Sequence, residues 1–390
     1  MGNNHYMDES ESLPLLPSYE PVLSPKPRSR SRCCVLLCLF AVLALLFSGF
    51  AIILTLPVSR SVSKDFPPDG PGIGFVLSTH YASVAIRNED GTIDNVARIE
   101  ASQDYISLLQ RLSLPSSRHP APPYHSASEK FSDRPRQLRR AARKRLGYPA
   151  SPDVGILASL FQELADAAQA HLPSSRPTLM SALAVIPNAM ALYSEDVQDA
   201  LEYIGLQALT GHNVYAVPRA LPAAYAGYGM GLCEHPENFE ECLEEEKGME
   251  RRGVVIVDAG RGALATDSRG MDTPMYVYND QYATLDWHAW GREEGGTTDE
   301  YRDRIAGDIG YAVGGLVRRS LLPAGAKVVD EVLMAGEQGE DQVLKDIVRE
   351  EVAKYQDEEA IIRCEDPQWV VARGAAELAK RVLVQRGRVM

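Results

Sequence analysis

The order of strand-like and helix-like segments occurs twice along the chain, and this repeat restricts the fold more than any other feature. In each copy, three short β-prone runs are followed by helices that alternate with further buried strands. Alternation of this kind is typical of α/β proteins, and its repetition indicates two lobes with any ligand between them, at the turns after the first strands. The six opening runs lie at 73–78, 81–87, 92–98, 254–257, 264–267 and 275–278.

The segments between these runs give less regular signals. Residues 114–135 are rich in Pro, Ser and His and are expected to form a loop, with a basic helix over 136–146 after it. A helix over 196–209 is expected to lead into a strand at 214–217. The last helix is predicted to begin at Asp366-Pro367, because an acidic N-cap followed by proline is a typical helix start.

An uncharged run of 24 residues, 33–56, is rich in Leu, Val, Phe and Ala. A helix rises about 1.5 Å per residue, so this run could cross a hydrocarbon core of about 30 Å. Core helices, the alternative, rarely contain such long apolar runs. Four cations precede the run and two follow it, which favours a cytosolic N-terminus. We expect a single-pass membrane protein of an endomembrane or the cell surface, held in the lipid bilayer by residues 33–56.

The tail before this run, residues 1–32, is rich in Pro, Ser and acidic residues, so we expect it to be disordered and cytosolic. It contains two patterns that resemble adaptor-read sorting signals and that also arise by chance: Glu11 with Leu15 and Leu16, and Tyr19 with Val22. The divisions expected after the tail are a transmembrane helix at 33–56, a linker at 57–71, a first lobe at 72–232, an acidic loop at 233–252 and a second lobe at 253–390.

Several motifs occur in the order found in the actin and sugar-kinase superfamily. Residues 74–85 and 258–262 resemble the two phosphate loops in the nucleotide-binding domain of the seventy-kilodalton heat-shock chaperones. Gly295-Gly296 resembles the glycine pair that follows, and Ala335-Gly336 resembles the adenosine turn. The resemblance covers about residues 72–387. It implies a two-lobed actin-like ATPase fold, a duplicated ribonuclease-H-like unit, in a trimmed, membrane-tethered, fungal-type relative.

The resemblance also implies a nucleotide site, but one that lacks part of its chemistry. Hydrolysis in this superfamily needs carboxylates at both phosphate turns to hold hydrated magnesium, and Val76 and Ala265 stand where the family has aspartates. Each lost preorganised group costs about 10²–10³ in rate, so we expect a degenerate ATPase with no catalytic residue. Binding of ATP and magnesium without hydrolysis stays open, since Arg261 could pair with a phosphate. The nucleotide-binding candidates are Thr79, Asp258, Gly260, Arg261, Gly262, Gly295, Gly296 and Gly336.

Three other groups of residues bear on chemistry. Lys144 resembles the family's catalytic lysine, but it also fits a solvated basic helix face. Cys233 and Cys242 bracket an acidic loop and could close a disulfide ring in an oxidising lumen, or could be two unconnected thiols. The histidines show no metal-ligand spacing, so no metal site is predicted.

Charge and motifs then rank the functions. A net charge of −13, from 40 Lys and Arg against 53 Asp and Glu, argues against binding to nucleic acid. We expect a non-hydrolysing binding or scaffolding module with an unknown protein partner. The first alternative is an active ATPase of the same superfamily. The second is a luminal glycosyltransferase-type enzyme, which the absence of an Asp-x-Asp motif disfavours.

Overall fold

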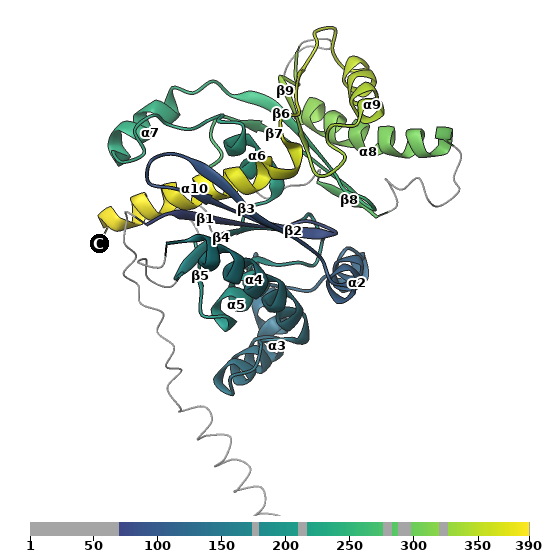
Figure 1. Cartoon of the computed structure of the whole chain (residues 1–390). Helices are drawn as coiled ribbons and strands as arrows, with labels where there is room; N and C mark the ends of the chain where they lie inside the picture. Colours follow the sequence, from purple (N-terminus) through teal and green to yellow (C-terminus); the bar gives the residue numbers. More distant parts are fainter. Residues whose placement is uncertain are drawn as a thin grey trace, which may run out of the picture. The chain divides into compact units, whose positions relative to one another are not determined.

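The structure is a computed structural model of the chain, and it describes residues 70–173, 179–209, 217–275, 283–287, 298–319 and 327–389. The chain divides into two units, residues 1–56 and Pro57–Met390, and the structure describes residues of the second alone. This second unit is called the body below. The body contains two mixed five-stranded sheets, which confirms the prediction of an α/β architecture (Figure 1).

The first sheet has the strand order β3-β2-β1-β4-β5. Its first three strands form an antiparallel meander, whereas β4 pairs in parallel with β1, and β5 pairs in parallel with β4. Ile73, Phe75 and Leu77 face one side of the sheet and Val76 faces the other, so β1 is buried on both faces. The strands are β1 Gly72–Leu77, β2 Tyr81–Arg87, β3 Ile93–Glu100, β4 Ser181–Val185 and β5 Gln207–Ala208.

The second sheet repeats this pattern, with the order β10-β9-β6-β7-β8. Here β6, β7 and β8 form the antiparallel meander, and β9 and β10 continue in parallel beyond β6. The two sheets therefore carry their first hairpins, β1–β2 and β6–β7, in equivalent positions. The strands are β6 Arg252–Ala259, β7 Leu264–Met271, β8 Thr284–Asp286, β9 Glu331–Ala335 and β10 Ile361–Arg363.

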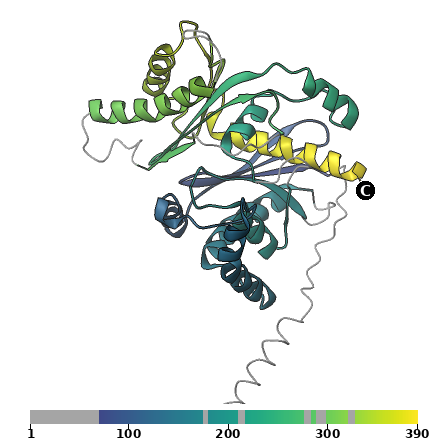
Figure 2. The ribbon, with the colours of Figure 1, turned by 180° about the vertical axis from the view of Figure 1, so that it is seen from behind.

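Helices cover the outer faces of both sheets and fill the space between them (Figure 2). The core outside the first sheet involves α2 Gln103–Leu112, α4 Pro152–His171 and α5 Ser194–Tyr203. The core between the sheets involves α6 Ala220–Gly227 and α10 Pro367–Val389, and the core outside the second sheet involves α8 Thr298–Arg319 and α9 Gln342–Ala353. The remaining elements are the short helix η1 Pro115–Ser117, α3 Ala127–Arg145 and α7 Phe239–Lys247.

Small residues let α10 approach the first sheet and α6 closely. A Cβ atom on Gly74 of β1 would lie 2.2 Å from the Ala376 nitrogen, and one on Gly374 would lie 1.7 Å from the Ala223 carbonyl oxygen. Only glycine fits such contacts. The last helix of the chain thus packs against the first sheet, although the sequence places it in the second lobe.

The prediction of a membrane-spanning helix is corrected. Among the described residues, no helix is long and apolar enough to cross a bilayer. The two longest, α8 and α10, carry charged side chains such as Arg304 and Glu377. Residues 33–56 themselves, and the sorting patterns in 1–32, lie outside the described residues. The single-pass topology, the bilayer anchor and the membrane localisation are therefore not carried further.

Two local predictions are also corrected. The helix α3 begins at Ala127, inside the expected loop, because the Ser126 hydroxyl accepts from the Glu129 amide, and Glu129 accepts from the His125 amide. Pro135 lies within α3 on its exposed side. The strand after α5 is β5 at Gln207–Ala208, because α5 ends at Tyr203; most of the expected strand at 214–217 lies outside the described residues.

Candidate functional site at the two hairpin turns

Two hairpin turns meet between the sheets, and most of the predicted nucleotide residues lie on them. The turn between β1 and β2 contains Thr79 and is closed by a hydrogen bond from the Ser78 amide to the Tyr81 carbonyl (2.9 Å). The turn between β6 and β7 is closed in the same way, from the Gly260 amide to the Ala263 carbonyl (2.9 Å).

The side chains of the first turn lie directly against the backbone of the second. A Cβ atom on Gly260 would be 3.2 Å from Thr79 Oγ1, and one on Gly262 would be 2.9 Å from Cε1 of His80. Thr79 is buried, and its hydroxyl lies 3.2 Å from Nδ1 of His80. The two turns therefore contact each other at the place where the family resemblance puts a nucleotide's phosphates.

Four charged residues join these turns into one network, called here the ion-pair cluster: Arg98, Glu100, Arg261 and Glu337. Arg98, on β3, pairs with Glu337 and with Glu100, the latter at 3.2 Å. Arg261 on the second turn pairs with Glu337 at 3.2 Å and with Glu100 at 3.5 Å. Two cations and two carboxylates balance, so the cluster is neutral as a whole. It connects the first sheet to the second turn and to the turn after β9.

Arg98 is also held by an aromatic ring. Its guanidinium lies 4.4 Å from the centroid of the Tyr81 ring, a distance suited to a cation–π contact. Tyr81 is buried at the start of β2, next to the first turn. Arg98 is thereby fixed between the ring and the carboxylate of Glu337 rather than left free to meet a ligand.

Asp258 is the last residue but one of β6, and it lies beside this cluster. Burial raises the pKa of its carboxyl group to about 6, and the group makes no hydrogen bond or ion pair within the described part of the chain. Gly336 must be glycine here, because its φ is +82° and a Cβ atom would lie 2.6 Å from Asp258 Oδ1. Asp258 is thus an uncompensated carboxylate between the second turn and the turn after β9.

A second contact between the sheets lies beside the first turn. The Trp287 indole nitrogen donates to the Ser113 hydroxyl (2.8 Å), and the rings of Trp287 and His80 lie 6.2 Å apart. Leu285 and Trp287 pack on the core of the first sheet.

Burial, and then the nearby Arg261 charge, lower the pKa of His80, so its ring is neutral at pH 7.

The structure therefore brings together six of the eight predicted nucleotide-binding residues: Thr79, Asp258, Gly260, Arg261, Gly262 and Gly336. Gly295 and Gly296 lie outside the described residues. Val76 and Ala265, where the resemblance implies that carboxylates were lost, are buried apolar residues on β1 and β7. Arg98, Glu100 and Trp287 were not predicted, and no local sequence pattern distinguishes them.

Lys144 lies away from both turns. Its ammonium group pairs with Asp199 Oδ1 (2.8 Å) and Glu202 Oε2 (2.6 Å) of α5. On the same face of α3, Arg140 pairs with Asp196 (2.7 Å) and Asp199 (2.6 Å). Lys144 therefore holds α3 against α5, and its ammonium group does not reach a ligand at the turns.

Cys233 and Cys242 are joined in a disulfide. The sequence leaves open whether they form this bond or are two unconnected thiols. Both are buried, and Arg381 of α10 donates to the Cys233 carbonyl (3.0 Å). The bond ties the start of the acidic loop to α7.

No protein-family model matches the chain, and no curated protein matches it. Membership of the actin-like superfamily therefore stays a prediction.

Proposed function

We propose that the body is a degenerate actin-like ATPase that acts as a non-hydrolysing binding or scaffolding module for a protein partner. The observation that carries this proposal is the ion-pair cluster. Arg261 is the one cation of the second turn, and it is already paired with Glu337 and Glu100. Arg261 therefore offers a triphosphate little uncompensated positive charge.

The electrostatics around the turns argue against a bound triphosphate. The ion-pair cluster is neutral as a whole, so it offers a polyphosphate no net attraction, and the unpaired carboxylate of Asp258 would repel it. Magnesium would reduce this repulsion, but Val76 and Ala265 offer it no ligand. Direct contact between the two turns adds a steric obstacle.

The fold supports the superfamily resemblance. Both sheets have the same strand order, and their first hairpin turns meet face to face. This is the arrangement expected if one ancestral unit was duplicated and a ligand once lay between the copies. A body that keeps this shape while its own side chains occupy the ligand position could still bind a protein partner on its surface. It would no longer hydrolyse a nucleotide.

An active ATPase is the second candidate, and one observation favours it. Asp258 has kept an unpaired carboxyl group near the end of β6, and with a pKa of about 6 it is mostly ionised at pH 7. A single carboxylate could still orient a hydrated cation. No contact among the described residues favours the glycosyltransferase alternative.

Thermal unfolding of the full chain with and without magnesium and ATP separates these functions. A ligand at about 100 times its Kd would add about 2.7 kcal/mol to the stability of the folded state. We expect no shift in the melting temperature. A clear shift, together with magnesium-dependent release of phosphate that Asp258→Ala abolishes, would instead establish an active ATPase.

A further inference from the structure

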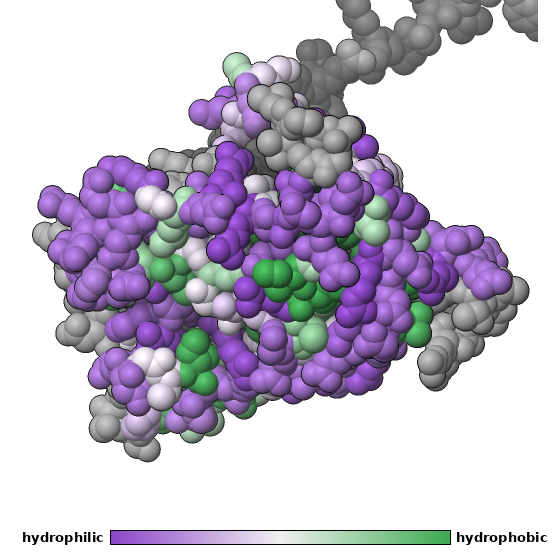
Figure 3. Space-filling view, turned by 90° about the horizontal axis from the view of Figure 1, so that it is seen from above, coloured by the Kyte–Doolittle hydropathy of each residue, from purple (hydrophilic) through white to green (hydrophobic). Residues whose placement is uncertain are grey.

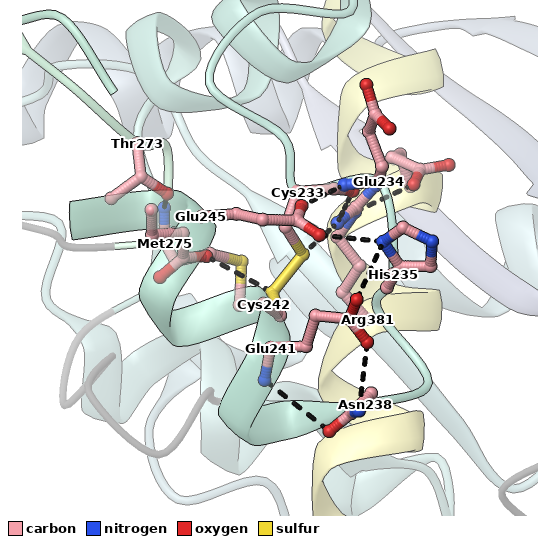
Figure 4. Close-up of a disulfide and its surroundings, with 12 residues drawn as sticks. Cys233, Glu234, His235, Asn238, Glu241, Cys242, Glu245, Thr273, Met275 and Arg381 are labelled. Atoms are coloured by element: carbon pink, nitrogen blue, oxygen red, sulfur yellow. Dashed lines mark hydrogen bonds and ion pairs between the residues drawn. A yellow bond between two sulfur atoms is a disulfide. The ribbon is translucent and has the colours of Figure 1, made fainter. Parts of the chain in front are cut away.

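The acidic segment between α6 and β6 forms a platform on the body, called here the disulfide loop and comprising residues 233–247. The buried Cys233–Cys242 bond closes its ring, and Arg381 holds Cys233 against α10 (Figure 4). The loop includes α7 (Figure 1), and the face of the body viewed in Figure 3 is largely hydrophilic around an apolar patch near its centre.

Three donor groups converge on this platform. The Nδ1 atom of His235 lies 2.7 Å from Oε1 of Glu245 and 3.7 Å from Oε1 of Glu241. Glu241 and Glu245 are one turn apart on α7, so both carboxylates face the histidine (Figure 4). All three donor atoms lie within 4.8 Å of one another.

Groups outside this triad orient its carboxylates. The Asn238 side-chain amide donates to Oε2 of Glu241 (2.9 Å), and the Glu234 backbone amide donates to Oε2 of Glu245. In each carboxylate, the outer oxygen is therefore held and the Oε1 atom is left pointing at the histidine. Metal ligands in proteins are commonly fixed by supporting hydrogen bonds of this kind.

We propose that His235, Glu241 and Glu245 bind a divalent cation of the zinc class, with water in the fourth position. Tetrahedral zinc has ligand bonds of about 2.0–2.2 Å, which places neighbouring donor atoms about 3.4 Å apart. The distances of 2.7 and 3.7 Å bracket this value, so small side-chain shifts suffice. An imidazole nitrogen with two carboxylates suits zinc better than the all-oxygen cations calcium and magnesium.

The cation would take the place of the proton that His235 and Glu245 share in their hydrogen bond. His235 now satisfies only Glu245 with a hydrogen bond, and Glu241 stays at the longer distance. A divalent cation compensates both carboxylates at once, and it also offsets the charges of the neighbouring acidic residues on α7. Sequence spacing did not indicate this site, because the histidine lies in the loop and its carboxylates lie on the helix.

Titration of the full-length protein with zinc chloride, in competition with a chromophoric zinc indicator, tests the proposal. We expect one saturable site in the wild type and at least about tenfold weaker binding in His235→Ala and in Glu245→Gln. Glu240→Gln is the matched control, since it removes the same charge from an exposed position on the same helix outside the triad. Its affinity should stay within about twofold of the wild type.

Two results would overturn the proposal: unchanged zinc affinity in His235→Ala, or an equal loss in Glu240→Gln and Glu245→Gln. The second result would mean diffuse attraction to an acidic surface. All three positions are at the surface, and circular dichroism of each variant checks the fold. Cobalt(II) gives an independent readout, because a four-coordinate visible spectrum should appear in the wild type and be lost in His235→Ala.

Discussion

The Nε atom of Arg261 lies 3.2 Å from Oε2 of Glu337, a carboxylate whose side chain is only 10% exposed. The contact joins the turn between β6 and β7 to the turn after β9, and Arg98 reaches the same carboxylate from β3. One nearly buried group thus compensates two cations from different parts of the body. These contacts hold β3, the turn between β6 and β7 and the turn after β9 together.

Replacing Glu337 with glutamine should destabilise the body by about 2 kcal/mol. Removing one partner of a buried ion pair typically costs about 3–5 kcal/mol, and the exposure of Arg261 reduces this because solvent screens its charge. Urea unfolding at pH 7 measures the loss. Glu163→Gln, at an exposed position on α4, should change stability by less than about 0.5 kcal/mol. Equal effects of the two substitutions would contradict a role for the cluster.

Asp258 should make the body less stable as the pH rises from about 4 to 6. Its pKa is about 6 in the folded state and about 4 when unfolded, so between these values the folded state binds more protons. Stability is therefore lost with rising pH, by about 2–3 kcal/mol in total at most. Asp258→Asn should remove the part of this slope that Asp258 contributes and be the more stable protein at pH 7, whereas Asp308, whose pKa is also raised to about 6, keeps its own part. Urea unfolding of both proteins across this pH range checks the sign, and parallel curves would refute it.

The sequence predicts the strands of this fold well where they are long and buried on both faces. The runs that became β1, β2 and β6 are apolar and bounded by turn residues, so local pattern is sufficient. The short strands are different. β5 has two residues and β10 has three, and they form only because β4 and β9 present open edges to them.

Some residues of the candidate site could likewise be predicted from the sequence, and others could not. Thr79 and Gly260 could be located because each lies at a turn between two recognisable strands. Arg98 and Glu100 could not, because each is an ordinary charged residue near the end of β3 until the fold brings Arg261 and Glu337 beside it. Contacts between residues distant in sequence leave no local pattern to recognise.

Gly374→Ala should destabilise the body by more than about 3 kcal/mol or prevent folding, because the new methyl group would lie 1.7 Å from the Ala223 carbonyl oxygen. Gly307 in α8 is the matched control. A Cβ atom there meets nothing within 4 Å, so Gly307→Ala should raise the stability by about 0.5–1 kcal/mol through helix propensity alone. Thermal unfolding of both variants measures the difference, and two changes of the same sign would show that α10 does not pack on α6 this closely.

The disulfide between Cys233 and Cys242 should stabilise the body by about 2.5–3 kcal/mol, the chain-entropy value for a ring of this length. The double substitution to serine should therefore lower the free energy of unfolding by that amount, and it should also weaken the hold of Arg381 on the loop. Urea unfolding of the wild type under oxidising and reducing conditions gives the same comparison without substitution. Cys364→Ser is the control, because Cys364 is a free thiol whose loss should leave the response to reductant unchanged. If reduction of the wild type left the free energy of unfolding unchanged, the disulfide would be dispensable. The acidic loop would then have to be held by Arg381 and by the packing of the loop on α10.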